Sequence, residues 1–546
     1  YPLFQMVLRK GLFWFYLEHR DIRPIVKEEK KPPCSRLYIP DKKNLLFQVS
    51  YYEKRINFEV FHALTDGTGA MHFLQELVSN YLKKAHPKQD LPSLPVTDMS
   101  TPGDQEEDSF SQYYSSDIPG NSEKKPRAVR LPGERLLHED MHITEIVLPV
   151  KELHAKAKEY GVSITILITA MFLCSIHEEI PKSRQNRPIA LMVPVNLRNY
   201  FPSQSMANFF GWIEVGHDFS QTSDFTEILA HVKEQFAAEL VEEKIARHMN
   251  SYVRLEKNPV IRAVPLEIKK YFLMLGANLS SRSITAVYSN IGILRFPKEY
   301  NQYIDRFGIF ASTNSMQLCS CSYENEMVLG FTSKLPKDNI QRNFLNMLKK
   351  EEIPYTEKTN NFPGCSLKEK KEAQRIVQVF NFVCIAAAIL CGMINYLTRE
   401  KLDWFWFAAA GCLCGWLIVA YAKRRNILKN EIIQLILVTV IAVLWDKYTG
   451  WHGWSLDFVL PFGALAVLGS IPVIVKVQKL EKEEYLFYLV QAAFAGLVPL
   501  ILMFFHQIRF PYPSVVCTGI SLLVFAGMFI FNSNDTIREF HKKLRM

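Results

Sequence analysis

The chain has 546 residues, enough for roughly two to four domains, which excludes a mini-protein or a scaffold stapled by disulfides. Its 64 Lys and Arg against 55 Asp and Glu give a net charge of +9, a mild excess that suits an anionic membrane surface or a phosphate-bearing ligand. No zinc-finger spacing, dense basic stripe or RNA-binding signature occurs before residue 366, so nucleic acid is not an expected partner.

The chain begins with Tyr-Pro-Leu-Phe rather than with an initiator Met, and these residues read like the middle of a domain. We therefore expect the N-terminus to be truncated. Residues 45–51 and 56–61 alternate between apolar and polar side chains, which predicts two strands joined as a hairpin. Apolar residues then recur at helical spacing from Met71 to Leu82, which predicts a helix.

His62 follows the second predicted strand directly, and Asp66 and Gly67 come just before the predicted helix. A side chain at such a junction is held on a rigid element while it faces a cleft, as an acid or base in catalysis requires. Asp66 needs a cationic partner if it is buried, and Gly67 tolerates a left-handed backbone or a close approach. These residues are therefore candidates for a catalytic site.

Three later segments have simpler interpretations. Residues 86–135 hold many Pro, Ser and acidic residues and predict a long surface linker. Residues 161–176 begin like a capped, buried helix. Cys319 and Cys321 would share one face of a strand, but no second pair or neighbouring His accompanies them, so we expect packing and no metal site.

The segment His62-Ala63-Leu64-Thr65-Asp66-Gly67 resembles the His-x-x-x-Asp-Gly signature of the CoA-dependent acyltransferase superfamily. That superfamily includes chloramphenicol acetyltransferase, alcohol acetyltransferases, wax ester synthases and the condensation domains of nonribosomal peptide synthetases. Two further pairs of segments are similar to it: Val193–Arg198 with Asn208–Gly211, and Ser289–Gly292 with Gly330–Ser333. The resemblance covers roughly residues 1–355, which we predict to be an acyltransferase-like domain.

The resemblance implies an α/β fold like that of chloramphenicol acetyltransferase, with two similar halves and a tunnel between them. It implies that His62 is the general base for direct transfer from acyl-CoA, a co-substrate, with no acyl-enzyme intermediate and no bound cofactor. Asp66 would be a structural partner of Arg198, with Gly67 in the adjoining turn. Ser289 and Asn290 would line a substrate site. The acceptor would be an alcohol or a lipid-linked molecule.

Two departures favour the branch of bacterial alcohol acetyltransferase-like proteins. The sequence lacks the Asp-Phe-Gly-Trp-Gly motif of plant acyltransferases, and only one His precedes the x-x-x-Asp-Gly part of the signature, where condensation domains usually have two. Two alternatives stay open. The domain could be a degenerate acyltransferase fold that serves as a sensor or scaffold, or an amide-forming enzyme of the condensation type with a carrier-protein donor.

The C-terminal part is far more apolar than the rest of the chain. We predict a basic juxtamembrane linker over residues 356–375, followed by an all-α transmembrane domain over 376–546. Its apolar stretches are close to the ~20 residues that cross ~30 Å of hydrocarbon, and we count about six. They are 376–397, 402–422, 432–445, 458–475, 486–505 and 514–532.

Loop charges predict the orientation, because cytoplasmic loops accumulate Lys and Arg. Basic clusters precede the first stretch, follow the second and fourth, and end the chain, whereas the alternate loops hold one or two basic residues each. We therefore predict a multi-pass protein of the cell membrane, with the N-terminal domain and the C-terminus in the cytoplasm. The stretches hold no ionisable residue at mid-membrane depth, which favours an anchor or lipid-facing platform over a transporter.

Overall fold

The structure is a computed structural model, and it describes residues 1–38, 44–94, 108–119, 125–136, 140–358, 362–363, 367–398, 411–412, 415, 427–478, 480 and 482–544. The chain divides into two compact units. The first holds most of the described residues up to 363, and the second holds those from 367 onward together with Arg9–Phe15.

The N-terminal part of the chain holds two small sheets. β1 (Met6–Lys10) pairs with β2 (Phe15–His19), and β3 (Lys27–Glu28), β4 (Phe47–Tyr52) and β5 (Arg55–Val60) form a three-stranded sheet. β4 and β5 are antiparallel, with Phe47 opposite Val60 and Tyr52 opposite Arg55, which confirms the predicted hairpin. The predicted helix is α1 (Gly67–Ala85), which starts four residues before Met71 because Asp66 caps it.

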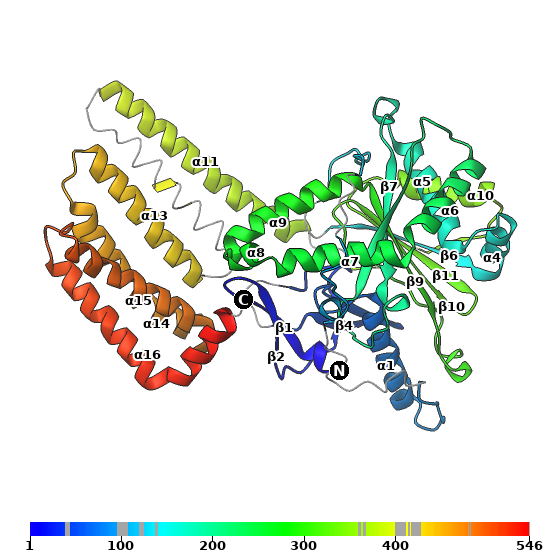
Figure 1. Cartoon of the computed structure of the whole chain (residues 1–546), viewed down its shortest axis with the longest axis horizontal. Helices are drawn as coiled ribbons and strands as arrows, with labels where there is room; N and C mark the ends of the chain where they lie inside the picture. The colour runs from blue at the N-terminus through cyan, green and yellow to red at the C-terminus, as the bar shows by residue number, and fades with distance from the viewer. Residues whose placement is uncertain are drawn as a thin grey trace. The chain divides into compact units, whose positions relative to one another are not determined.

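A seven-stranded sheet forms the centre of the first unit (Figure 1), in the order β12-β6-β11-β10-β9-β7-β8. β9 runs parallel to both β7 and β10, and the other pairings are antiparallel. The strands are β6 (His142–Pro149), β7 (Ile189–Asn196), β8 (Phe210–His217), β9 (Ala286–Leu294), β10 (Met316–Tyr323), β11 (Glu326–Ser333) and β12 (Thr356–Lys358).

Four helices cover one face of this sheet and share a core with it: α4 (Val150–Glu159), α5 (Ile164–Glu179), α6 (Phe225–Glu239) and α10 (Asn339–Lys350). α5 is the helix predicted to be capped and buried. Ser163 Oγ accepts the N–H of Ile166 at 3.3 Å, and the apolar residues from Leu167 to Leu173 are fully buried. The α/β class is confirmed, although the seven-stranded and three-stranded sheets differ in size.

Three more helices follow α6 in the chain: α7 (Glu242–Lys257), α8 (Pro259–Ala263) and α9 (Leu266–Ser280). The predicted linker 86–135 contains the short helix α3 (Ser109–Gln112), while its residues 95–107 and 120–124 lie outside the described residues. β12 and the start of α11 both fall within 356–375, the segment expected to be a linker.

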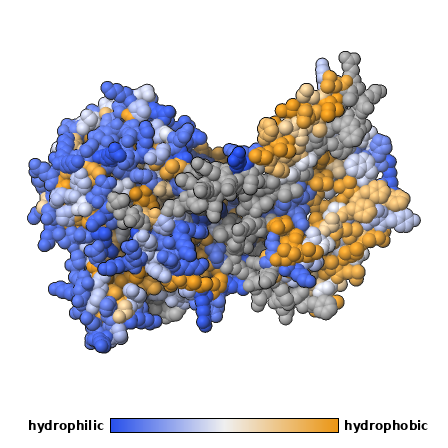
Figure 2. Space-filling view, turned by 180° about the vertical axis from the view of Figure 1, so that it is seen from behind, coloured by the Kyte–Doolittle hydropathy of each residue, from blue (hydrophilic) through white to orange (hydrophobic). Residues whose placement is uncertain are grey.

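From residue 367 onward, the second unit is helical where it is described, apart from short turns. Its helices are α11 (Leu367–Thr398), α13 (Ile427–Tyr448), α14 (Leu460–Gln478), preceded by the π-helical turn Ser455–Val459, α15 (Lys482–Phe504) and α16 (Tyr512–Leu544). Hydrophobic side chains cover much of the face of these helices that Figure 2 shows. This confirms the predicted apolar helical region at the C-terminus.

Three helices in the described residues are long and apolar enough to cross a membrane: Ile427–Tyr448, Ser455–Gln478 and Tyr485–Phe504. They correspond to the third, fourth and fifth predicted stretches. The first and sixth correspond to shorter apolar segments, Gln378–Ile394 and Tyr512–Met528, and most of the second lies outside the described residues. The predicted count of six and the predicted orientation stay predictions.

Candidate active site

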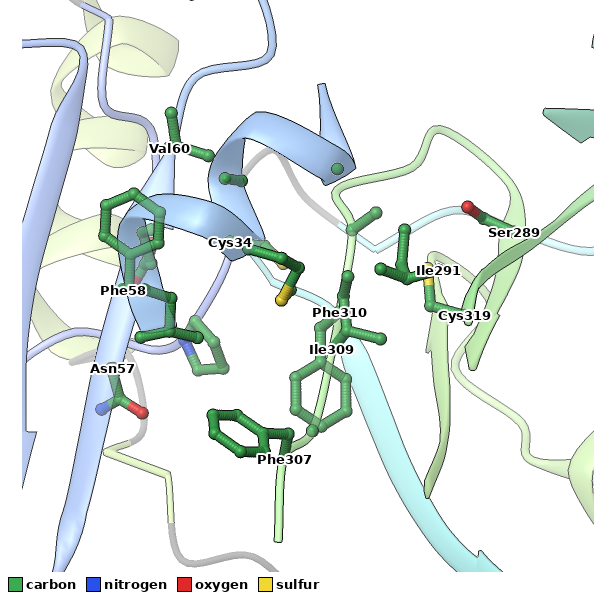
Figure 3. A pocket seen from close by; sticks show the side chains of 18 of the residues that line it. Cys34, Asn57, Phe58, Val60, Ser289, Ile291, Phe307, Ile309, Phe310 and Cys319 are labelled. Carbon is green, nitrogen blue, oxygen red and sulfur yellow. The ribbon is translucent and has the colours of Figure 1, made fainter. Parts of the chain in front are cut away.

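His62 lies two residues after the end of β5 and lines a cavity of about 1770 Å³ in the first unit. Two groups of segments form opposite walls of the cavity. One wall comes from β5 and the segment around Cys34, and the other from β9 and β10, as Figure 3 shows with Phe58, Ile291 and Cys319. His62 is accessible from this space, and its ring centroid lies 5.2 Å from that of Phe210 at the start of β8. The ring therefore faces a space that could admit substrates.

Asn208 holds His62 through two hydrogen bonds. Its side-chain Nδ2 donates to the backbone carbonyl of His62 at 2.7 Å, and its Oδ1 lies 3.2 Å from His62 Nδ1. Since a carbonyl oxygen can only accept, the first bond fixes which amide atom is nitrogen, and the second then requires a proton on Nδ1. In the neutral imidazole the other ring nitrogen, Nε2, then carries the lone pair that a general base would use.

Asp66 is 5% exposed and caps the first turn of α1. Its Oδ1 accepts the N–H groups of Thr68 and Gly69, both at 3.1 Å. Its Oδ2 accepts the N–H of Phe209 at 2.9 Å and Nη1 of Arg198 at 2.6 Å. One carboxylate therefore joins the start of α1 to the loop between β7 and β8, and the pairing of Asp66 with Arg198 is present.

Arg198 binds several backbone carbonyls in the same loop, and its side chain is only 11% exposed. Its Nη2 donates to the carbonyls of Ser205 and Ala207 at 2.8 and 2.7 Å, and its Nε donates to that of Ser205 at 3.1 Å. The guanidinium thus shapes the loop that carries Asn208. Asp66 and Arg198 act on His62 indirectly, by positioning the residue that binds its ring.

Gly67 lines the cavity, and a Cβ at this position would lie 2.6 Å from Cδ1 of Ile291, which is the end of a side chain that can move. Gly69 is under a stricter constraint, because its Cβ would lie 2.5 Å from the carbonyl oxygen of Met206, a backbone atom. Sequence reasoning assigned a role to Gly67 and none to Gly69. The Gly-x-Gly spacing at the helix start was the available signal for a close approach.

Ser289 and Asn290 lie on β9, and both line the cavity. Asn290 Nδ2 donates to Thr165 Oγ1 at 2.9 Å, and its Oδ1 accepts the N–H of Gly292 at 3.0 Å. These bonds brace an irregularity in the register of β9 against β10, where Gly292 has a φ of +92°. The Asn290 side chain is therefore structural, whereas Ser289 shares the cavity wall with Ile291 (Figure 3).

Sequence reasoning missed the acid Glu59 and the thiol of Cys34 in the cavity wall, and it expected Cys319, which also lines the cavity, only to pack. Burial, with a smaller contribution from Glu29, raises the pKa of Glu59 to about 7. Burial also raises the pKa of both thiols to about 12, so neither is a thiolate nucleophile near neutral pH. Among the described residues, no group of three His, Cys, Asp or Glu side chains could hold a metal ion.

Comparisons with known proteins match the two parts of the chain separately. Residues 149–297 match a family model described as the C-terminus of phthiocerol/phthiodiolone dimycocerosyl transferase, and residues 362–546 match one described as a family of unknown function. A search of curated proteins finds no match. The family match confirms the resemblance to transferases for residues 149–297. The particular likeness to alcohol acetyltransferases stays a prediction.

Three solved structures that are similar to this chain each match over 64% of it. The epimerization domain from the third module of tyrocidine synthetase B has 11% identity, a TM-score of 0.38 and 84% of its own chain covered. Polyketide synthase associated protein 5 from Mycobacterium tuberculosis has 14% identity, a TM-score of 0.39 and 86% of its own chain covered. Wax ester synthase/diacylglycerol acyltransferase from Marinobacter aquaeolei VT8 has 13% identity, a TM-score of 0.36 and 86% of its own chain covered. TM-scores below 0.5 do not by themselves establish a shared fold.

Proposed function

We propose that this chain is a membrane-anchored O-acyltransferase that moves an acyl group, most simply acetyl, from CoA to the hydroxyl of an acceptor. The observation that carries the proposal is the state of His62. Its Nδ1 is held by Asn208, and its ring lies at a cavity on the first unit. The match of residues 149–297 to a transferase family supports the same class of reaction.

In this reaction Nε2 of His62 takes the proton of the acceptor hydroxyl while the oxygen attacks the thioester carbonyl. A tetrahedral intermediate forms and collapses, the carbon–sulfur bond breaks, and the CoA sulfur leaves with the proton from the imidazolium. Asn208 keeps its bond to Nδ1 throughout, so the ring does not turn between the two proton transfers. The products are the acylated acceptor and free CoA, and no group on the protein is acylated.

The cavity is large enough for a donor and an acceptor together, since a site for one drug-sized ligand is about 300–1,000 Å³. Ser289 is the polar side chain of β9 best placed to touch an occupant. Acyl-CoA is the co-substrate, and an alcohol or lipid-linked acceptor suits a chain whose second unit lies in the membrane. We place the first unit and the C-terminus on the cytoplasmic side, where acyl-CoA is available.

The test compares His62→Ala with His72→Ala in the full-length protein. His72 lies on the exposed face of α1 and does not line the cavity, so it is a matched control. With acetyl-CoA and a lipid extract, His62→Ala should lower the rate of free thiol release by ~100-fold or more, and His72→Ala should equal the unmodified protein. Equal rates in both variants would refute the assignment of His62 as the base. Faster turnover with an acyl-carrier protein than with acyl-CoA would show that the carrier protein, and not CoA, is the acyl donor.

A further inference from the structure

α9 exposes large apolar side chains along its whole length. Every residue from Tyr271 to Arg282 is exposed, and six apolar side chains of the helix are at least half exposed. They are Ile268 (52%), Tyr271 (61%), Phe272 (69%), Met274 (58%), Leu275 (57%) and Leu279 (50%). A surface helix of a globular protein normally turns such residues toward the core, so the exposed apolar residues of α9 indicate contact with an apolar environment.

Most of the six exposed residues are spaced as one stripe. Positions 268, 271, 275 and 279 follow one another at intervals of three or four residues, which places them on one side of a helix. Val260 of α8, 73% exposed, adds to the apolar surface just before α9. The 15 residues of α9 span about 22 Å, too short to cross ~30 Å of hydrocarbon. The stripe therefore suits a helix that lies on a membrane.

Basic residues surround the stripe. Residues 254–282 contain six Lys or Arg and two Glu. Arg254, Lys257, Arg262 and Arg282 are in exposed positions at the ends of the segment. An apolar face flanked by Lys and Arg is the chemistry that binds anionic phospholipid headgroups, because the apolar side chains enter the acyl region while the cations stay at the headgroups.

We propose that α9, together with Val260, lies in the lipid–water interface and gives the first unit its own contact with an anionic membrane. A bilayer is the favoured occupant because the same chain carries three helices long and apolar enough to cross one. This tether keeps the first unit near lipid at high effective concentration, so even a weak interfacial helix would stay bound. The proposal goes beyond the transferase activity and does not depend on the chemistry of His62.

Photo-crosslinking of the full-length protein tests the contact. p-Benzoylphenylalanine is placed at Phe272 in one variant and at Tyr51 in the other, because Tyr51 is a 48% exposed aromatic residue on β4 of the same unit. Both proteins are reconstituted into liposomes of phosphatidylcholine and phosphatidylglycerol, irradiated, and digested for mass spectrometry. Phospholipid adducts should form at position 272 several-fold more than at 51, and omitting phosphatidylglycerol should lower their yield.

Three results would overturn the proposal. Adducts from position 272 to peptides of residues 427–544 would show that helices of the same chain cover α9, and adducts to a second copy would show an oligomer contact. Equal lipid labelling at positions 272 and 51 would remove the special role of α9. Gel filtration and thermal melting establish that both variants fold. These measurements do not use acyl transfer, so failure of the proposed activity would leave this test intact.

Discussion

Replacing Asp66 by Asn tests the buried ion pair that joins α1 to the loop between β7 and β8. Asn has the same shape, and its Oδ1 can still accept the two N–H groups at the start of α1, so the helix cap is preserved. The amide nitrogen, however, replaces Oδ2, which accepts Nη1 of Arg198 and the N–H of Phe209. In the variant the amide N–H donor therefore faces two other donors, Arg198 Nη1 and the N–H of Phe209, and Arg198 loses its counter-charge.

The cost follows from the burial of the pair, whose side chains are 11% and 5% exposed. Breaking such a pair costs about 3–5 kcal/mol. Because Arg198 keeps the carbonyl oxygens of Ser205 and Ala207, we expect a loss near the lower end, about 3 kcal/mol in the free energy of unfolding. At about 2 °C per kcal/mol for a large unit, the melting temperature should fall by about 6 °C. Asp66→Ala should lose about 1 kcal/mol more with the cap.

The assay is thermal loss of the β-sheet infrared band of the full-length protein in detergent, because nearly all described strands belong to the first unit. Glu243→Gln is the matched control, since it breaks an exposed ion pair with Arg247 on α7 and should cost less than about 0.5 kcal/mol. If Asp66→Asn melts no earlier than Glu243→Gln, the reasoning about the buried pair is wrong.

Three further predictions follow from single residues. Asn208→Ala should lower kcat about 10- to 100-fold with little change in KM, because the ring of His62 loses its orientation while the cavity stays intact; an unchanged kcat would exclude this role. Burial raises the pKa of Glu59 to about 7, so its contribution to stability is present below pH 4.5 and is lost as the pH rises through 7. Between pH 5 and pH 8 the unmodified protein should therefore lose more in melting temperature than Glu59→Gln, and equal losses would contradict the shift. Asp446 is fully buried and accepts the backbone N–H groups of His452, Gly453 and Ser455, so Asp446→Ala should cost about 3 kcal/mol or more, measured as earlier loss of helical circular dichroism on heating.

The sequence predicted features that depend on neighbouring residues. The β4–β5 hairpin follows from alternation over a few positions, and α1 follows from helical spacing. The partner of Asp66 could also be anticipated, because a buried carboxylate requires a cation and the resemblance offered Arg198. Each of these inferences needs only a local pattern or a simple chemical requirement.

The remaining parts of the site depend on tertiary structure. Asn208 appeared in the sequence only as part of a supporting motif. Its role follows from the register of β7 and β8, where Asn196 pairs with Phe210 and the residues between return to His62. The cavity wall from Phe307 to Phe310 lies in a segment without helix or strand, so no periodic pattern in the sequence predicts it. Glu59 did have a signal, since it shares the polar side of β5 with Asn57.

The contacts of His62 and Asp66 have a consequence for how the protein reaches its active form. Asn208 and Arg198 are 146 and 132 positions away from their partners, so the imidazole of His62 is oriented only after two distant stretches of polypeptide meet. Closing so long a loop is slow compared with forming a helix or a hairpin, which places this meeting late in folding. A nascent chain that has emerged only as far as α1 would carry the imidazole without the amide that aligns it. The arrangement on which the proposed catalysis depends would then appear together with completion of the large sheet.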